Sequence, residues 1–371
     1  MKSKAKVSNV YLVDLRASME SGVLDRLKTC VRKAGLLKIG REGDLLAVKL
    51  HFGEKGCTGY IRTAYVRAVL EAIEPSGCVP FLTDTNTLYV GSRSDSVRHL
   101  RTAFEHGFSY GSMGVPAIIA DGLKGGSYEP VRIDGKHFDE AMIASDIARA
   151  DSLLVLTHVK GHELTGIGGA LKNLGMGCAN RAGKLAMHSD VRPYVSKDRC
   201  TGCAKCVEWC PAGAISVKNK KATIDSDVCI GCAECIVVCR FKAIRIDWDM
   251  SVSLVQEKIA EYAKGVIRTK KKIGYVNFIM DVSPQCDCYP FSDAAVVPNV
   301  GILVSLDPVA IDKASADLIN AQPALPGTAL KPGKKERDQL KHLYGGLDWE
   351  IQIKHAERLG LGTSRYKLIK V

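Results

Sequence analysis

The chain has 371 residues, of which 46% are hydrophobic and 25% charged, and its formal net charge is +12. This length suits one large α/β domain with a small additional module, and the composition is that of a soluble globular protein. The N-terminal residues include lysines but no apolar segment behind them, and no apolar run approaches the ~20 residues of a membrane span. We therefore expect a cytoplasmic protein without a membrane-spanning helix.

Apolar, β-branched segments alternate with helix-like segments along most of the chain. Helical patterns occupy regions such as 21–34 and 63–73. Strands that are apolar throughout and separated by helices indicate an α/β fold with a mostly parallel sheet covered on both faces. The predicted strands are Val10–Asp14, Leu45–Leu50, Val79–Thr83, Ala117–Ala120, Leu153–Thr157, Ile273–Met280 and Ile302–Leu306.

Between two stretches of this alternation lies a segment with a different pattern. The alternation stops near residue 191 and resumes near residue 251. The predicted α/β domain is therefore discontinuous, with residues 1–190 as its first part and residues 249–371 as its second part. Residues 191–248 form a small inserted α+β domain.

The insert contains two copies of one cysteine pattern. Residues 197–217 (KDRCTGCAKCVEWCPAGAISV) align with residues 226–246 (SDVCIGCAECIVVCRFKAIRI), and all four cysteines recur at an offset of 29 residues. Each copy spaces its cysteines as C-x2-C-x2-C-x3-C, which is the pattern of bacterial-type ferredoxins. Two such copies wrapped around two clusters can bury a core that neither could bury alone.

Eight of the fourteen cysteines are therefore predicted ligands of two [4Fe–4S] clusters. In this motif the fourth cysteine of each run binds the cluster of the other run. Zinc bound by two C-x2-C ribbons is the alternative, but such ribbons lack the third C-x2 spacing. The predicted ligands are Cys200, Cys203, Cys206 and Cys239 for one cluster and Cys229, Cys232, Cys235 and Cys210 for the other.

Polar and charged side chains follow the carboxyl ends of several predicted strands. In open parallel sheets, ligands bind in the crevice outside those ends. Ordinary turn residues and helix caps are the alternative explanation for part of this set. The ligand-binding candidates are Lys49, His51, Asp84, Asn86 and Asp281, and Thr87 and Asp307 follow strands in the same way.

The densest of these segments is residues 158–177 (HVKGHELTGIGGALKNLGMG), whose glycines form neither a Walker A loop nor a G-x-G-x-x-G motif. Gly166, Gly168 and Gly169 precede a short helix whose backbone N–H groups could hold an anion, with Lys172 and Asn173 beside it. A tight loop packed against the sheet is the alternative. The catalytic candidates in this segment are His158, Lys160, His162 and Lys172.

Cys286 and Cys288 form a C-x-C pair after the predicted strand 273–280. A disulfide closed over one residue is strained, so the pair suits soft-metal ligation or redox chemistry. With Asp281 or a histidine it could bind a further metal, and inert buried cysteines are the alternative. Both cysteines are therefore catalytic candidates and candidate metal ligands.

Five segments form a recognisable combination: KLHFGEKG (49–56), FLTDTNTLYVGSR (81–93), THVKGHELTGIGGALKNLGMGC (157–178), NFIMDVSPQCDC (277–288) and SLDPVAID (305–312). Together they resemble the domain-of-unknown-function 362 family, specifically its iron–sulfur-containing members from anaerobic bacteria and archaea. The resemblance covers nearly the whole chain. It implies a discontinuous α/β domain interrupted by a two-cluster ferredoxin insert, and it implies no substrate.

The predicted function is electron transfer through two [4Fe–4S] clusters to a substrate or metal site at the strand ends, as in a ferredoxin-dependent oxidoreductase. The alternative is a non-enzymatic electron carrier, or an accessory protein for cofactor or metal-centre assembly, which needs only the eight cluster cysteines. The expected partners are a redox partner protein and an anionic small molecule. Nucleic acid is not expected, because the basic residues are scattered and cluster thiolates would lower the net charge.

Overall fold

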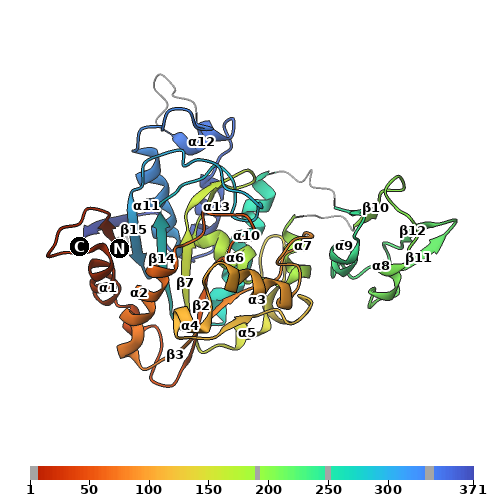
Figure 1. Ribbon diagram of the computed structural model, residues 1–371, viewed down its shortest axis with the longest axis horizontal. Coiled ribbons are helices and arrows are strands. Elements are labelled where there is room, and N and C mark those ends of the chain that lie inside the picture. Colours follow the sequence, from red (N-terminus) through yellow and green to blue (C-terminus); the bar gives the residue numbers. More distant parts are fainter. Residues whose placement is uncertain (1–6, 189–192, 247–251, 331–337) are drawn as a thin grey trace, which may run out of the picture.

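The computed structural model describes residues 7–188, 193–246, 252–330 and 338–371. Its main body is an eight-stranded sheet with helices packed on both faces (Figure 1). In spatial order, the strands are β16 (Tyr366–Lys370), β1 (Ser8–Asp14), β15 (Gly301–Ser305), β14 (Ile273–Ile279), β7 (Ser152–His158), β2 (Leu45–Lys49), β3 (Val79–Asp84) and β4 (Ala117–Ile119). Neighbouring strands of this sheet are parallel, except that β15 runs against β1 and β14. The mostly parallel α/β fold expected from the sequence is confirmed.

The sheet combines strands from both sides of the cysteine-rich segment. β7 precedes that segment and β14 follows it, and the two pair in parallel with Thr157 opposite Asn277. The C-terminal strand β16 pairs with the N-terminal strand β1, so the two ends of the described chain lie side by side (Figure 1). Two separated stretches of chain therefore build one sheet. The domain boundaries expected at 190–191 and 248–249 lie outside the described residues.

Successive residues of a strand point to opposite faces of the sheet, so each strand contributes to two buried clusters. In β7, Leu153 and Val155 join one cluster, and Leu154 and Leu156 join the other. The cluster of Leu154 also contains residues of α1 (Val23–Lys33), α2 (Thr63–Ile73), α3 (Ser96–Glu105) and α4 (Tyr110–Met113). The cluster of Leu153 contains residues of α5 (Ser145–Arg149), α6 (Ala170–Cys178), α7 (Arg181–His188), α10 (Val252–Arg268), α11 (Pro308–Asn320), α12 (Gln339–Leu343) and α13 (Glu350–Arg358).

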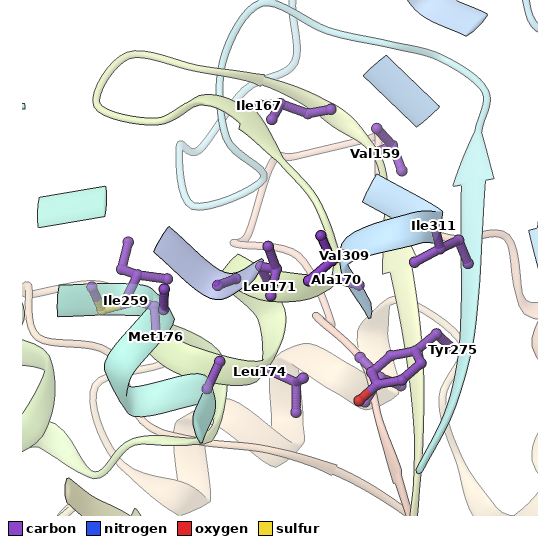
Figure 2. Close-up of a cluster of buried hydrophobic side chains, with 14 of the residues drawn as sticks. Val159, Ile167, Ala170, Leu171, Leu174, Met176, Ile259, Tyr275, Val309 and Ile311 are labelled. Atoms are coloured by element: carbon purple, nitrogen blue, oxygen red, sulfur yellow. The ribbon is translucent and has the colours of Figure 1, made fainter. Parts of the chain in front are cut away.

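The position of α6 is fixed by apolar contacts with α10 and α11. Figure 2 shows Leu171 and Leu174 of α6 in the same buried cluster as Ile259 of α10 and Val309 of α11. Gly175 permits the close approach of α6 to α10, because a Cβ atom there would overlap the backbone carbonyl of Ile259. The helix that follows the densest polar segment of the sequence is therefore closely packed against the core.

Short elements complete the main body. Within the described ranges, no helix has the length and apolar character needed to cross a membrane. The short elements are the antiparallel pairs β5 (Tyr128–Arg132) with β6 (Glu140–Ala144) and β8 (Lys160–His162) with β9 (Gly166–Gly168), and the 3-10 helices Leu36–Lys38 and Glu74–Ser76.

The cysteine-rich segment forms a separate small unit beside α7, drawn in green at the right of Figure 1. Its two repeats adopt the same backbone conformation, with left-handed φ at Gly202 and Ala204 and again at Gly231 and Ala233. The internal repeat of the sequence is therefore also a repeat of local structure. Its elements are β10 (Tyr194–Val195), α8 (Lys205–Glu208), β11 (Ile215–Lys218), β12 (Lys221–Ile224), α9 (Glu234–Val238) and β13 (Ile244–Arg245).

The reversed direction of β15 corrects one expectation from the sequence. Asp307 follows β15 and was expected at the same edge of the sheet as the other polar side chains. Because β15 is antiparallel to β14, its carboxyl end lies at the opposite edge, where Ser305 is paired with Tyr275. There Asp307 accepts hydrogen bonds from the backbone N–H groups of Val309 and Ala310 and caps α11.

Candidate functional site

A cavity of about 750 Å³ lies beyond the carboxyl ends of β2, β3 and β7. This is the crevice outside the strand ends in which parallel sheets bind ligands. Most of the side chains selected from the sequence line it. They are Lys49, His51, Asp84, Thr87, His158, Lys160, His162, Gly168, Gly169, Lys172, Asn173, Cys286 and Cys288.

Three further candidates do not line this cavity. Asn86 is buried and bonds to the carboxylate of Asp121, so it fixes a loop. Gly166 has a left-handed φ of 69° and packs against Trp349. Asp281 forms an exposed ion pair with Arg62, 2.8 Å away. Local structure explains their positions, and they lie apart from the candidates that line the cavity.

A buried network of opposite charges forms one wall of the cavity. Lys49 has no exposed surface and lies 3.0 Å from Asp84. It also donates a hydrogen bond of 2.7 Å to Asn173 Oδ1. Arg93 is 1% exposed and contacts Asp84 at 3.5 Å and Glu54 at 3.3 Å. Although burial opposes it, Lys49 holds the pKa of Asp84 well below its usual range.

Asp287, the residue between the two cysteines of the C-x-C pair, is held by a histidine and a lysine. Its carboxylate lies 3.0 Å from His158 Nδ1 and 2.8 Å from Lys160 Nζ, and the side chain is almost fully buried. The other ring nitrogen of His158 faces the backbone oxygen of Met280 at 2.9 Å. Against the effect of burial, His158 and Lys160 keep the pKa of Asp287 well below its usual range. His158 and Lys160 therefore position the C-x-C segment.

The two thiols of the C-x-C pair face each other, with Sγ atoms 2.9 Å apart. His51 accepts a hydrogen bond from the backbone N–H of Gly53 at Nδ1, so in the neutral ring the proton is on Nε2. This Nε2 lies 3.5 Å from Cys288 Sγ. Lys172 Nζ lies 3.8 Å from Cys286 Sγ. The hydrogen bond that Cys286 donates lowers the pKa of Cys288 well below its usual range, although burial opposes the shift, and His51 adds to the lowering. The same hydrogen bond, together with burial, raises the pKa of Cys286. The contact therefore favours negative charge on Cys288 over negative charge on Cys286.

A carboxylate of the protein itself satisfies the N-terminus of α6, where the sequence suggested an anion site. Asp312 accepts the backbone N–H groups of Ala170 at 2.6 Å and Leu171 at 2.8 Å. It also accepts a hydrogen bond of 2.9 Å from Asn277. A Cβ atom on Gly169 would overlap this carboxylate. The glycine therefore serves close packing, and the helix N-terminus is not open to an external anion.

Replacing Asp312 with alanine is expected to destabilise the protein by roughly 2–4 kcal/mol, because it removes a helix cap and leaves buried donors unpaired. Urea unfolding monitored by circular dichroism measures the change. Asp317→Ala on the same helix is the control, because Asp317 is partly exposed and its ion pair with Lys313 is at the surface. Equal stability of the Asp312→Ala variant and the wild type would show that the cap contributes nothing.

Further basic side chains surround the cavity. Burial lowers the pKa of Lys184 to about 8, although Asp121 opposes the shift. Burial also lowers the pKa of His188 to about 4, with Lys172 adding to the effect. The pKa of His162 is lowered well below its usual range for the same two reasons. Near neutral pH the two histidines are uncharged, and the positive charge of this region is carried by the lysines.

The eight cysteines of the repeat line two small cavities in the cysteine-rich unit. Each set contains three cysteines of one repeat and the fourth cysteine of the other repeat. Among the described residues, no three His, Cys, Asp or Glu side chains converge closely enough to hold a single metal ion. The two cysteine-lined cavities make the stretch 200–239 a candidate for binding metal clusters. The first cavity is lined by Cys200, Cys203, Cys206 and Cys239, and the second by Cys210, Cys229, Cys232 and Cys235.

Backbone N–H groups point at three of these sulfur atoms. Ala214 donates to Cys210 Sγ and Ala243 donates to Cys239 Sγ, each at 3.3 Å and at equivalent places in the two repeats. Ala222 donates to Cys200 Sγ at the same distance. Donors of this kind stabilise negative charge on sulfur and tune the potential of a bound cluster.

The cysteine-rich unit and the cavity share part of their walls. Leu88 lines the large cavity and belongs to the same buried apolar cluster as Cys200, Cys206 and Cys235. Lys242, from the cysteine-rich unit, also lines the large cavity. Apolar packing therefore connects the cysteine cavities to the site at the strand ends.

The family model named "Domain of unknown function (DUF362)" matches residues 46–317 of the chain. The chain belongs to this family. The resemblance expected from the sequence is thus confirmed for the family, whose name gives no activity. No curated protein matches this DUF362 chain at a significant level.

Two solved structures resemble this DUF362 protein at low similarity. The lactate racemase apoprotein from Thermoanaerobacterium thermosaccharolyticum matches with a TM-score of 0.43 and 10% identity over 98% of this chain and 83% of its own. A structural-genomics protein from Thermotoga maritima matches with a TM-score of 0.38 and 10% identity, over 69% of this chain and 50% of its own. At these values neither match bears on the activity of the chain.

Several residues of the DUF362 site were not selected from the sequence. Glu54, Tyr89 and Arg93 lie within segments that support the family resemblance, but their roles depend on contacts across the chain. Asp287 lies between Cys286 and Cys288, so its position in the sequence could have identified it as a site residue. Lys184 had no such signal, because α7 brings it to the cavity.

Proposed function

We propose that this chain is an iron–sulfur redox protein that carries two [4Fe–4S] clusters and exchanges electrons with a chemical site in the cavity at the strand ends. The pair of four-cysteine cavities carries the proposal. Each contains the crossed set of ligands that the C-x2-C-x2-C-x3-C spacing requires for a two-cluster ferredoxin.

The chemistry of the donor set fits cubane clusters better than zinc. The sulfur atoms surround a cavity and do not meet at one point, whereas a structural zinc ion needs four ligands at ~2.3 Å from a common centre. Each cavity also has apolar neighbours, including Ile244 in the first and Ile215 in the second. Clusters bound here would supply one-electron transfer.

The residues between the two sites support a short route for electrons. Leu88 contributes to both the buried cluster around the cysteines and the wall of the large cavity. Lys124 Nζ lies 3.6 Å from the ring centre of Trp209, which docks the cysteine-rich unit on the main body. Direct packing of the two parts favours transfer within one chain over a role as a separate carrier.

The charge of the cavity favours an anionic substrate. Among the described residues, no carboxylate lies within ion-pair distance of Lys172 or Lys184, unlike Lys49 and Lys160. Lys172 also lies next to the cysteine pair. We infer that these two lysines bind a carboxylate or phosphate group and hold the substrate beside Cys286 and Cys288.

Reversible cluster reduction in the anaerobically purified protein tests the proposal. Dithionite should bleach the visible absorbance, and a one-electron acceptor added in excess should restore it. The Cys286→Ser/Cys288→Ser variant should bleach and recover in the same way, because its clusters are intact. A colourless protein, or a colour that dithionite leaves unchanged, would contradict the proposal.

A further inference from the structure

We propose that Cys286 and Cys288 form a two-electron dithiol–disulfide centre that exchanges one electron with each of the two clusters. The inference rests on the proposed function for the source of its electrons. The dithiol chemistry itself rests on the geometry of the pair, which can be tested separately.

The two sulfur atoms are closer together than two thiolates that share one metal ion would be. Cys286 Sγ and Cys288 Sγ are 2.9 Å apart. Two thiolates on one tetrahedral ion, each ~2.3 Å from it, would lie roughly 3.7 Å apart. A disulfide bond is ~2.05 Å long. In addition, no third His, Cys, Asp or Glu of the described chain completes a metal site with them.

The residue between the cysteines is fixed, so the sulfurs have few other positions available. The carboxylate of Asp287 is tied to His158 and Lys160 on the buried side. Its backbone oxygen accepts the N–H of Glu54 at 2.9 Å. Both flanking side chains line the cavity, and a small approach of the two sulfurs would close the bond.

The surroundings make one cysteine the nucleophile. Cys288 faces the Nε2–H of His51 and accepts a hydrogen bond from the thiol of Cys286, and both contacts stabilise its thiolate form. Lys172 supplies positive charge on the Cys286 side. A thiolate beside a thiol in an electropositive site is the arrangement of reactive dithiols, and inert core cysteines lack it.

The redox step balances with the two clusters. On oxidation, the S–H bond of Cys286 breaks, its proton leaves through the cavity, and an S–S bond forms to Cys288. The pair gives up two electrons, for which two clusters bound at the eight cysteines would be the acceptors, one electron each. On reduction, the disulfide would take up two electrons, one from each cluster after a one-electron carrier protein has reduced it, and one proton from the cavity, which restores the thiol of Cys286 and the thiolate of Cys288. The ring closed over one residue is strained, so we expect a labile disulfide that is easily reduced.

Peptide mass spectrometry tests the dithiol couple in the holoprotein. Trypsin releases residues 273–313 as one peptide whose cysteines are Cys286 and Cys288 alone. After a thiol oxidant, the peptide should be lighter by two hydrogens and resist alkylation. After dithiothreitol, both cysteines should be alkylated. Cys30, which is fully buried in the main body and lies outside this peptide, provides a control, and Cys30→Ser should leave the result unchanged.

Two outcomes would overturn the inference. One is a peptide that remains fully alkylated after oxidation. The other is a tightly bound metal ion that the wild type holds and the Cys286→Ser/Cys288→Ser variant loses. Either result would leave the clusters, measured by iron and sulfide content, unaffected.

The link to the clusters is tested with a one-electron donor that contains no thiol. Reduced viologen should convert the oxidised peptide to the dithiol in the wild type. The Cys229→Ser variant, which lacks a ligand of the second cluster, should lose this reaction and still respond to dithiothreitol. Equal reduction by viologen in both proteins would overturn the link. A wild type without iron and sulfide would overturn the proposed function instead.

Discussion

Replacing Cys210 with serine should remove the cluster of the second repeat, although Cys210 lies in the first. The second cavity is lined by Cys210 together with Cys229, Cys232 and Cys235. Since crossed ligation makes Cys210 a ligand there, the variant should retain about half of the ~8 irons of two [4Fe–4S] clusters. Iron analysis and electron paramagnetic resonance of the dithionite-reduced protein measure the loss.

Matching spectra identify which cluster each substitution removes. Cys210→Ser should give the same residual spectrum as Cys232→Ser, and Cys239→Ser the same as Cys203→Ser. Cys30→Ser is the matched control, because Cys30 is fully buried in the main body and should leave all iron in place. If Cys210→Ser instead matched Cys203→Ser, each repeat would bind its own cluster and the crossed arrangement would be refuted.

Replacing Lys49 with methionine should destabilise the protein by about 3–5 kcal/mol, the cost of leaving a buried carboxylate without its partner. Lys49 and Asp84 are both almost fully buried, and their charged atoms lie 3.0 Å apart. Arg93, at 3.5 Å, compensates only part of the lost charge. Urea unfolding monitored by circular dichroism measures the change.

A surface ion pair provides the control for this experiment. Lys28 and Glu71 are 2.5 Å apart but partly exposed, so Lys28→Met should cost no more than ~1 kcal/mol. Adding Asp84→Leu to Lys49→Met should recover part of the loss, since it removes the uncompensated charge. A loss below ~1 kcal/mol in Lys49→Met would mean that the charge network does not stabilise this wall of the cavity.

Much of the fold could be predicted because its signals are local. Apolar runs such as Leu153–Thr157 are within one or two residues of the observed strands, here β7 at Ser152–His158. The direction of β15 was not predictable in this way, because an antiparallel strand and a parallel one can have the same apolar composition. That single reversal moved Asp307 to the far edge of the sheet.

Site residues that follow parallel strands were predicted from the sequence. Site residues that reach the cavity region through contacts between distant parts of the chain were not. Lys49, Asp84 and His158 end β2, β3 and β7, and they reach the same cavity. Asp312 comes from a helix more than a hundred residues later in the chain, yet its carboxylate fills the anion position that the glycine-rich segment suggested. Contacts of this range leave no periodicity or spacing in the sequence.

Iron and acid-labile sulfide in the anaerobically purified chain test the central claim most directly. Two [4Fe–4S] clusters predict about eight irons and about eight sulfides per chain. Stoichiometric zinc without sulfide would contradict the claim, and so would a content near four of each, which corresponds to a single cluster.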